Sequence, residues 1–301
     1  MRPASERAVV VGIDGSESAR LAAVWGAEEA VRRGLPLRLV SVYTVPRVGL
    51  GSITGSVEAI RDGLEAQARV RLETASKSVR ALYPHRPVEL AAREWNPVAA
   101  LTQESERASL VVLGSRGLGG FTGLLVGSTA VALAGHGHCP VVVVRGRTPN
   151  TPPPVTGPVV VGLDGSADSV SALAFACEEA SWRRARLVAV HTWNPALADG
   201  KPRPHPLDLD PAEVDREERR VLAEQLAGWQ EKYPEIAIDR VVACGRPVQT
   251  LLDHAERAQL LVVGSRGLGG FRGMMLGSTS QALLAHSPCP VAVIRQTGEG
   301  S

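Results

Sequence analysis

Two glycine-rich stretches hold the residues of this 301-residue chain that are best suited to bind a ligand. The first follows the apolar run Leu110–Leu113 and contains Gly114, Arg116, Gly117, Gly127, Ser128 and Thr129. The residues after Thr129 predict a helix with Ser128 or Thr129 near its N-terminus. A strand, a glycine-rich loop and a helix start, in this order, direct free backbone N–H groups and the positive end of a helix at one point. Such a point suits a phosphate group.

The same stretch returns 150 positions later, as Gly264, Arg266, Gly267, Gly277, Ser278 and Thr279. Neither standard phosphate motif describes it. A Walker A loop needs a lysine where Gly120 and Gly270 stand, and a dinucleotide fingerprint needs a third glycine where Thr122 and Arg272 stand. Both copies instead keep the spacing Gly-x2-Gly-x9-Gly-Ser. The return of this spacing at a fixed interval argues against an idle flexible connection.

An aspartate follows the first apolar strand of each copy. Asp14 and Asp164 come two residues after Gly12 and Gly162, each within the tripeptide Asp-Gly-Ser. Each aspartate is either a turn residue or helix cap, or a carboxylate that binds ribose hydroxyls or Mg²⁺. Because ligands of parallel sheets bind beyond the carboxyl ends of the strands, the aspartate and the glycine loop can face one crevice.

Three other kinds of site find less support. Arg116 and Arg266 are either phosphate ligands or solvated loop residues. The run His136–Cys139 looks like a zinc cluster, but only His136 and the cysteine persist in the second copy, which argues against zinc. Local spacing provides no Ser–His–Asp arrangement and no paired carboxylates, so no residue receives a catalytic role.

Alternating strand and helix patterns must position these residues. In the first copy, strands are expected at 8–13, 37–42, 88–93, 110–113 and 140–145. Helices are expected after Ser16, over 57–82 and from Pro97. The helix after Ser16 is expected to bury Leu21, Val24, Trp25 and Val31 on one face and to stop at Gly34. The second copy follows the same plan, with a proline-rich loop at 194–210 before a helix that begins near Pro211.

The chain is an internal duplication. Val9–Ser16 recurs as Val159–Ser166, again 150 positions later, and 147–154 is a proline-rich stretch of the kind that forms a semi-rigid linker. We therefore expect one domain over 1–147, a linker over 148–156 and a second domain over 157–301. Alternating units of this type predict an α/β fold with a parallel sheet and helices on both faces in each domain.

Composition narrows the class of protein. A net charge of +2 and an aromatic content of 4% give no reason to invoke nucleic acid or an acidic membrane. No apolar segment approaches the length of a membrane span, and no signal peptide fits the N-terminus. The four cysteines show no CxxC spacing. We expect a cytoplasmic protein with reduced thiols.

Taken together, these motifs closely resemble the universal stress protein family, in a tandem form that covers almost the whole chain. The resemblance rests on Val-Gly-Ile/Leu-Asp-Gly-Ser after the first strand, on the Gly-x2-Gly-x9-Gly-Ser loop, and on Cys-Pro-Val in the last strand. The loop spacing is that of the ATP-binding branch of the family. The resemblance implies two doubly wound domains, each with a five-stranded parallel sheet in the order 3-2-1-4-5 and an ATP site.

The family pattern assigns a role to each matching residue. Asp14 and Asp164 match the aspartate at the end of the first strand, and Val42 and Thr192 match the position whose backbone contacts adenine. Gly114, Arg116 and Gly117 would lie along the ribose and phosphates, and Gly127, Ser128 and Thr129 would cradle the phosphates. Their second-copy equivalents are Gly264, Arg266, Gly267, Gly277, Ser278 and Thr279. The first copy departs from the family at Trp95-Asn96-Pro97, where the second keeps Gly245-Arg246-Pro247.

The leading hypothesis is a regulatory ATP-binding protein of the stress response, whose downstream partner the sequence does not name. The alternatives are a slow ATP hydrolase and a structural interaction module without nucleotide. Fast hydrolysis is not expected, because neither loop contains a lysine. The apolar last strands, Val141–Val144 and Val291–Ile294, are candidate edges for a homodimer.

Overall fold

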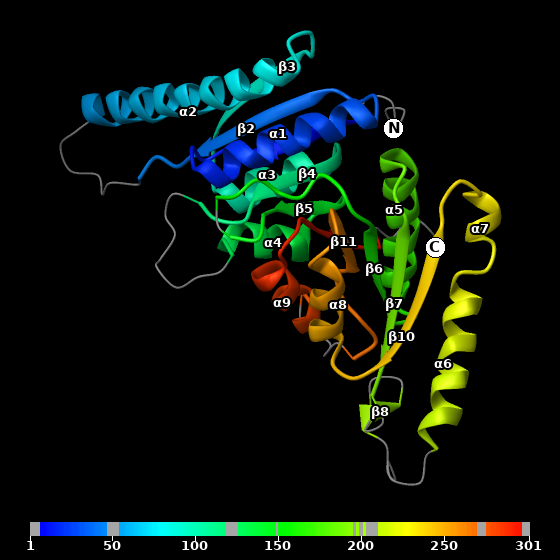
Figure 1. Ribbon diagram of the computed structural model, residues 1–301. Coiled ribbons are helices and arrows are strands. Elements are labelled where there is room, and N and C mark those ends of the chain that lie inside the picture. The colour runs from blue at the N-terminus through cyan, green and yellow to red at the C-terminus, as the bar shows by residue number, and fades with distance from the viewer. Residues whose placement is uncertain are drawn as a thin grey trace. The chain divides into compact units, whose positions relative to one another are not determined.

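A computed structural model describes residues 7–46, 54–117, 126–148, 150–194, 197–198, 201–202, 210–269 and 275–296. The chain divides into two units, Met1–Val144 and Arg145–Ser301. Residues 145–156 group with the second unit, and Arg147 within them donates a hydrogen bond to the Glu256 carbonyl at 2.8 Å. In each unit, strands that form a parallel sheet are connected by helices (Figure 1).

The first unit contains five strands and four helices among its described residues. In chain order they are β1 (Ala8–Gly12), α1 (Glu17–Arg32), β2 (Leu37–Tyr43), α2 (Thr54–Leu82), β3 (Val88–Glu94), α3 (Pro97–Ser105), β4 (Ala108–Gly114), α4 (Ser128–His136) and β5 (Val141–Val144). The strands pair in parallel in the order β3-β2-β1-β4-β5. This α/β fold and strand order confirm the prediction for the first copy.

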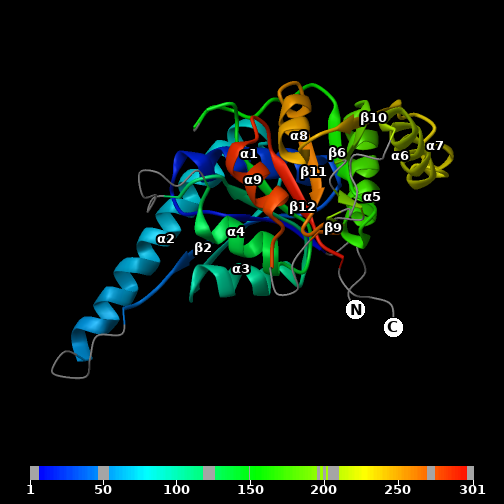
Figure 2. The ribbon, with the colours of Figure 1, turned by 90° about the horizontal axis from the view of Figure 1, so that it is seen from below.

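Helices cover both faces of this sheet. Helices α1 and α2 pack against each other on one face, and α3 packs beside α4 on the other (Figure 2). Central strands enclosed in this way need apolar side chains on both faces. In β1, Val9, Val10 and Val11 are at most 2% exposed. A continuous apolar run, rather than an alternating one, was therefore the correct signal for a strand.

Helix α1 buries a different face from the one that the sequence predicted. Trp25 is buried, but Leu21 and Val24 are only partly buried and Val31 is 43% exposed. The buried positions are mainly small residues: Ser18, Ala19, Ala22, Ala23, Gly26, Ala27 and Ala30. A Cβ on Gly26 would lie 2.6 Å from a Val11 methyl group, so the helix approaches β1 too closely for larger side chains.

The second unit repeats the arrangement. In chain order it contains β6 (Val159–Leu163), α5 (Ala167–Arg183), β7 (Leu187–Trp193), β8 (Leu197–Ala198), β9 (Lys201–Pro202), α6 (Pro211–Gln225), α7 (Trp229–Lys232), β10 (Ile238–Cys244), α8 (Pro247–Ala255), β11 (Leu260–Gly264), α9 (Ser278–His286) and β12 (Val291–Ile294). Its parallel strands follow the order β10-β7-β6-β11-β12, the same order as in the first unit.

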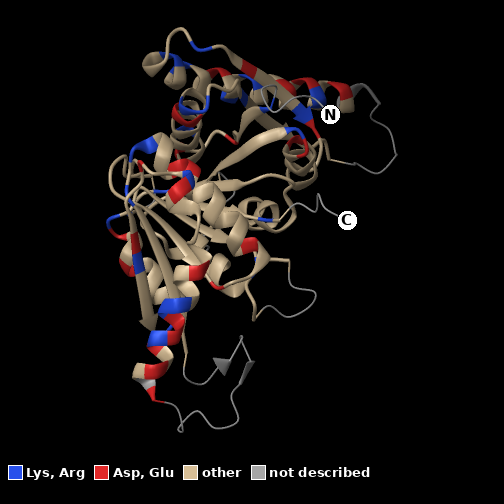
Figure 3. Ribbon diagram, turned by 90° about the vertical axis from the view of Figure 1, so that its right-hand side faces the viewer, with Lys and Arg blue, Asp and Glu red and all other residues tan. Residues whose placement is uncertain are grey.

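Two local features of the second unit differ from the first unit. The stretch expected to be a loop, 194–210, contains the short antiparallel pair β8–β9, and the rest of its interior lies outside the described residues. The helix that corresponds to α2 ends at Gln225 and resumes as α7 after Gly228, whose φ of +79° is left-handed. Charged residues of both signs are interspersed along the ribbon (Figure 3). None of the described helices is both long and apolar enough to cross a membrane.

Candidate functional site

The turn after β1 is organised by Asp14. Its Oδ1 atom accepts a hydrogen bond from the Ser16 backbone N–H at 2.9 Å, and Gly15 between them has a left-handed φ of +94°. A side chain would strain that backbone, so glycine is needed there. Ser16 then caps α1, because its Oγ atom accepts from the Ala19 N–H at 3.1 Å. Both structural roles considered for Asp-Gly-Ser are therefore present: Asp14 holds the turn, and Ser16 caps the helix.

The same turn contacts the glycine loop after β4. Ser16 Oγ donates a hydrogen bond to the Arg116 carbonyl at 3.1 Å. A Cβ placed on Gly117 would lie 2.5 Å from Asp14 Oδ2 and 3.7 Å from its carboxyl carbon. The Asp14 carboxylate therefore lies directly against the loop backbone. Asp14, Arg116 and Gly117, which are about a hundred positions apart in the sequence, meet at the carboxyl end of the sheet.

The second unit reproduces these contacts. Asp164 Oδ1 accepts from the Ser166 N–H at 3.0 Å, and its Oδ2 accepts from the Leu268 N–H, also at 3.0 Å. Ser166 Oγ donates to the Arg266 carbonyl at 3.3 Å, and a Cβ on Gly267 would collide with the Asp164 carboxylate. In both units the aspartate holds the turn and faces the loop.

The loop returns to its own beginning at the start of a helix. The Gly127 N–H donates to the Ser115 carbonyl at 2.8 Å, and the Gly277 N–H donates to the Ser265 carbonyl at the same distance. These contacts bring Ser128 and Thr129 next to the end of β4. They bring Ser278 and Thr279 next to the end of β11. Residues 118–125 and 270–274, the middle of each loop, lie outside the described residues.

The described residues leave room for a side chain at the start of α4. Gly127 has φ −68° and ψ 140°, values that any residue adopts, and among the described residues the nearest neighbour of a Cβ there would be Ser115 O, at 3.8 Å. Gly277 has a similar conformation but less room, because a Cβ there would lie 3.3 Å from Ser265 O and 3.5 Å from the Arg266 Cα. Neither glycine provides a side-chain cap for α4 or α9. The first N–H groups of these helices therefore face a space without a side-chain acceptor from the N-cap residue.

Other glycines of the motif are explained by packing. A Cβ on Gly12 would lie 2.5 Å from a Leu113 methyl group, and one on Gly114 would lie 2.6 Å from the Ser18 backbone. Gly162 faces Leu251 and Val263 in the second unit, and Gly264 faces Asp168. These four residues let the central strands approach neighbouring elements, which is a structural reason for glycine whether or not a ligand binds.

Val42 and Thr192 lie at the carboxyl ends of β2 and β7, one residue before the strand ends, and both are half-buried.

Next to Thr192, the buried His191 joins three elements. Its Nδ1 atom lies 2.8 Å from the Leu163 carbonyl, and its Nε2 atom lies 3.0 Å from Glu218 Oε2 on α6. The first unit has Ser41 at this position, so the link is specific to the second unit.

Sequence reasoning missed Asp168, which stands beneath the second loop. Its side chain is buried, and Oδ2 accepts from Ser265 Oγ at 2.7 Å and from the Arg266 N–H at 3.1 Å. Oδ1 accepts from the Gln296 N–H at 2.9 Å. The equivalent Ser18 makes two long contacts with described residues, 3.4 Å to Ser115 Oγ and 3.4 Å to the Arg116 N–H. Comparing the two copies position by position would have exposed this difference.

Three of the four cysteines are buried, and one is exposed. Burial raises the pKa of the Cys139, Cys177 and Cys289 thiols to about 12, whereas Cys244 at the end of β10 is exposed. No group of three or more metal-binding side chains occurs within the described ranges. His136 ends α4, and Cys139 lies buried before β5.

Two parallel α/β units, each with an equally spaced glycine loop beside an aspartate turn, define a tandem doubly wound protein. A model of the universal stress protein family matches residues 6–145 and again 156–295. The chain belongs to the universal stress protein family.

Relatives and structures agree with this assignment. The chain is 38% identical to universal stress protein Rv2005c of Mycobacterium tuberculosis, over 98% of this chain and 99% of that protein. It is 36% identical to universal stress protein Rv2623 of the same species, over 97% and 98%. The crystal structure of a universal stress protein from Archaeoglobus fulgidus matches 96% of this chain and 98% of its own with a TM-score of 0.66 at 22% identity, which supports the fold alone.

Proposed function

We propose that this protein is an ATP-binding regulator of the stress response with one nucleotide site in each unit. The sites are those expected from the sequence: Asp14, Val42 and the 114–129 loop in domain 1 (1–147), and Asp164, Thr192 and the 264–279 loop in domain 2 (157–301), with 148–156 as the linker. ATP is the proposed ligand because the loop spacing resembles the ATP-binding branch of the family.

One observation carries the proposal: both helix starts keep glycine, although the described residues leave open space for a side chain at Gly127. The fold tolerates a side chain at Gly127, yet both copies keep glycine where a helix start offers uncapped N–H groups. A phosphate group needs such a space and such donors. A purely structural connection would have no need of glycine at position 127, where the backbone conformation is one that any residue adopts.

The surrounding residues fit the rest of a nucleotide. Asp14 and Asp164 present a carboxylate at the carboxyl end of the sheet, where ribose hydroxyls would be recognised. Together with phosphate oxygens, a single carboxylate and the hydroxyls of Ser128 and Thr129 form an oxygen donor set of the kind that Mg²⁺ accepts. When bound, Mg²⁺ would neutralise phosphate charge; the protein residues themselves bind and orient the nucleotide.

The test is to count bound nucleotide by calorimetry and by mass spectrometry of material released from denatured protein. We expect two adenine nucleotides per chain. Gly127→Val should reduce this number to one, because the valine side chain would fill the phosphate space, and Gly277→Val should do the same at the other site. Each single variant keeps one intact site and therefore serves as the control for the other.

The outcome can be separated from misfolding. Because Gly127 has an ordinary backbone conformation and open space, Gly127→Val should unfold at nearly the wild-type temperature. Unchanged binding in both variants, or a preference for GTP or NAD, would contradict the proposal.

A further inference from the structure

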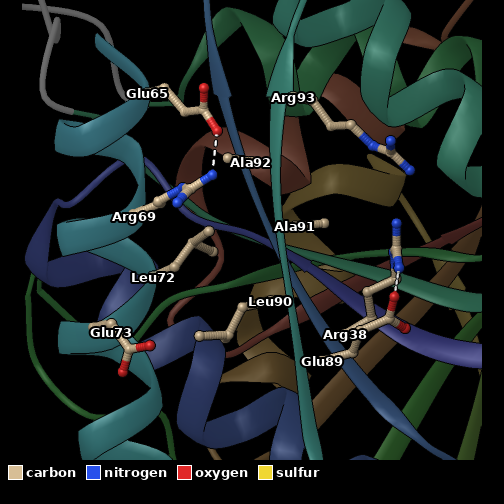
Figure 4. Close-up of a pocket in the computed structure, with 10 residues that line it drawn as sticks. All are labelled: Arg38, Glu65, Arg69, Leu72, Glu73, Glu89, Leu90, Ala91, Ala92 and Arg93. Carbon is tan, nitrogen blue, oxygen red and sulfur yellow. Dashed lines mark hydrogen bonds and ion pairs between the residues drawn. The ribbon is translucent and has the colours of Figure 1, made fainter. Parts of the chain in front are cut away.

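Strand β3 forms an open edge of the first unit. It pairs with β2 on one side, and no described strand of this unit pairs with its other side. A cavity of about 670 Å³ lies along it, lined by Arg38, by the β3 residues 89–93 and by Glu65, Arg69, Leu72 and Glu73 of α2 (Figure 4). An open edge with room beside it can accept another strand.

The backbone of β3 shows which groups face that edge. The Trp95 N–H donates to the Tyr43 carbonyl of β2 at 3.0 Å, and the pairing continues without a shift from Val88 to Glu94. In a parallel pair, alternate residues point their N–H and C=O groups toward the neighbouring strand. The backbone groups of residues 89, 91 and 93 therefore point toward β2. The backbone groups of Leu90 and Ala92 point outward, toward the open edge.

Side chains at this edge are small in the middle and oppositely charged on either side. Ala91 is flanked by Leu90 and Ala92, and beyond them lie Glu89 and Arg93, whose side chains are 62% and 51% exposed. Figure 4 shows Leu90 and Ala92 on the α2 side of β3 and Glu89, Ala91 and Arg93 on the other side. This pattern is self-complementary about Ala91.

We propose that β3 is the surface through which a second copy of this chain binds, as an antiparallel strand pair with its two-fold axis at Ala91. In this register Leu90 and Ala92 of the two copies exchange backbone hydrogen bonds, and Glu89 of one copy lies opposite Arg93 of the other. Centring the pair on Leu90 or Ala92 instead would place Glu89 opposite Ala91 or Trp95 and lose both charge pairs.

Existing ion pairs would extend across the interface. Arg38 contacts both Glu89 and Glu104 of the same copy, and Glu104 also accepts from Arg93 at 3.2 Å. A second copy would join two such groups through Glu89 and Arg93, and a network is worth more than isolated surface pairs. On α2, Glu65, Arg69 and Glu73 alternate in sign at intervals of four residues, so two antiparallel helices can place Arg69 opposite Glu73.

The equivalent strand of the second unit lacks this complementarity. Asp239 corresponds to Glu89 and is paired with Arg186, but Ala243 stands where the first unit has Arg93. The last strands, Val141–Val144 and Val291–Ile294, contain no charged residue and offer no such charge complementarity, so the contact predicted there from the sequence stays a prediction. The proposal therefore assigns the contact to β3.

Sedimentation equilibrium of the full chain tests the proposal. Wild-type protein should form dimers at micromolar concentration. Glu89→Arg and Arg93→Glu should each weaken self-association by about tenfold or more, because each places like charges opposite each other twice. The two variants mixed together should form a heterodimer, since positions 89 and 93 of one variant would then each face a residue of opposite charge in the other. Asp239→Arg is the matched control and should dimerise as the wild type does.

A second variant tests the backbone contact. Ala92→Pro removes an N–H that faces outward and leaves the pairing with β2 intact, so it should abolish dimers without unfolding the chain, as checked by thermal unfolding. A monomeric wild-type protein, or dimers that survive both Glu89→Arg and Ala92→Pro, would overturn the proposal. Failure of the mixed variants to associate would do so as well.

Discussion

Asp168 makes the two otherwise similar loops chemically different. The carboxylate accepts three hydrogen bonds from the backbone and side chain of residues that are far from it in sequence, whereas Ser18 makes two long ones. A carboxylate in the first turn of α5 also interacts favourably with the helix dipole. The second loop is therefore held more firmly than the first.

Replacing this residue should show the difference. Asp168→Ala leaves the Ser265 hydroxyl and the N–H groups of Arg266 and Gln296 without their acceptor, which we expect to cost about 1–3 kcal/mol of unfolding free energy. Ser18→Ala should cost clearly less, because its contacts are long. Unfolding in guanidinium chloride measures both. Equal shifts of the two unfolding midpoints would contradict the assignment.

At the scale of single residues, the sequence predicted those roles whose hydrogen-bond partners lie close by in the sequence. The turn at Asp14 and the cap at Ser16 could be predicted because their partners lie within three residues. The role of Asp168 depends on residues 97, 98 and 128 positions away, and no local pattern indicates them. The glycines gave an ambiguous signal, since the same residue type serves packing at Gly12 and open space at Gly127.

Helix α1 joins the turn to the loop through a single hydroxyl. Ser16 Oγ both accepts from the Ala19 N–H and donates to the Arg116 carbonyl, so it caps the helix and fixes the loop. We expect Ser16→Ala to lower stability by about 1 kcal/mol, the usual value of an N-cap. The same variant should weaken nucleotide binding at the first site, because the loop loses its anchor.

Ser16→Thr retains the hydroxyl and is the appropriate control. Denaturant unfolding and calorimetry on the three proteins separate the two effects. If Ser16→Ala unfolds at the wild-type denaturant concentration and binds with wild-type affinity, the hydroxyl has neither role.

The elements themselves were predictable, but not which face of each is buried. Most strand and helix bounds could be predicted to within a few residues, because long apolar runs and capping residues mark them. The buried face of α1 was predicted wrongly, because large residues were expected to face the core. A helix that packs closely on a parallel sheet instead buries alanine and glycine, as Ala22, Ala23 and Gly26 do. The periodicity of apolar residues carries no information on how closely a helix approaches the sheet.

For the whole molecule, the duplication and the parallel α/β class could be derived from the sequence, and the strand order came from the resemblance to a family. Pattern matching cannot order strands, because every buried parallel strand has a similar apolar run. The order decides which strand is left at the edge. The contact proposed for β3 therefore required the structure.

Binding without rapid turnover is expected of the molecule as a whole. The chain has only three lysines, Lys77, Lys201 and Lys232, and none lies in either loop. Backbone N–H groups and hydroxyls bind ground-state phosphate, whereas fast phosphoryl transfer needs an additional charge and an oriented water. We expect hydrolysis, if measurable, to take on the order of minutes to hours for one turnover. The measurement is single-turnover hydrolysis of radiolabelled ATP.

A steady-state rate of about one per second would contradict this expectation. Its loss in the double variant Asp14→Ala and Asp164→Ala would assign the activity to the proposed sites. In that event the protein would be an enzyme rather than a regulator.

Trp95 in the first unit and Cys244 in the second give each unit one exposed position from which an optical signal can be obtained. Trp95 ends the β2–β3 pairing in the first unit and is 61% exposed, and the second unit has an exposed thiol, Cys244, one residue before the equivalent glycine. The other three thiols are buried and remain protonated at neutral pH, because their pKa is raised to about 12. A dye attached to Cys244 would report on the second unit, and the fluorescence lost in Trp95→Phe would report on the first. Occupancy of the two halves could then be followed separately in a single titration.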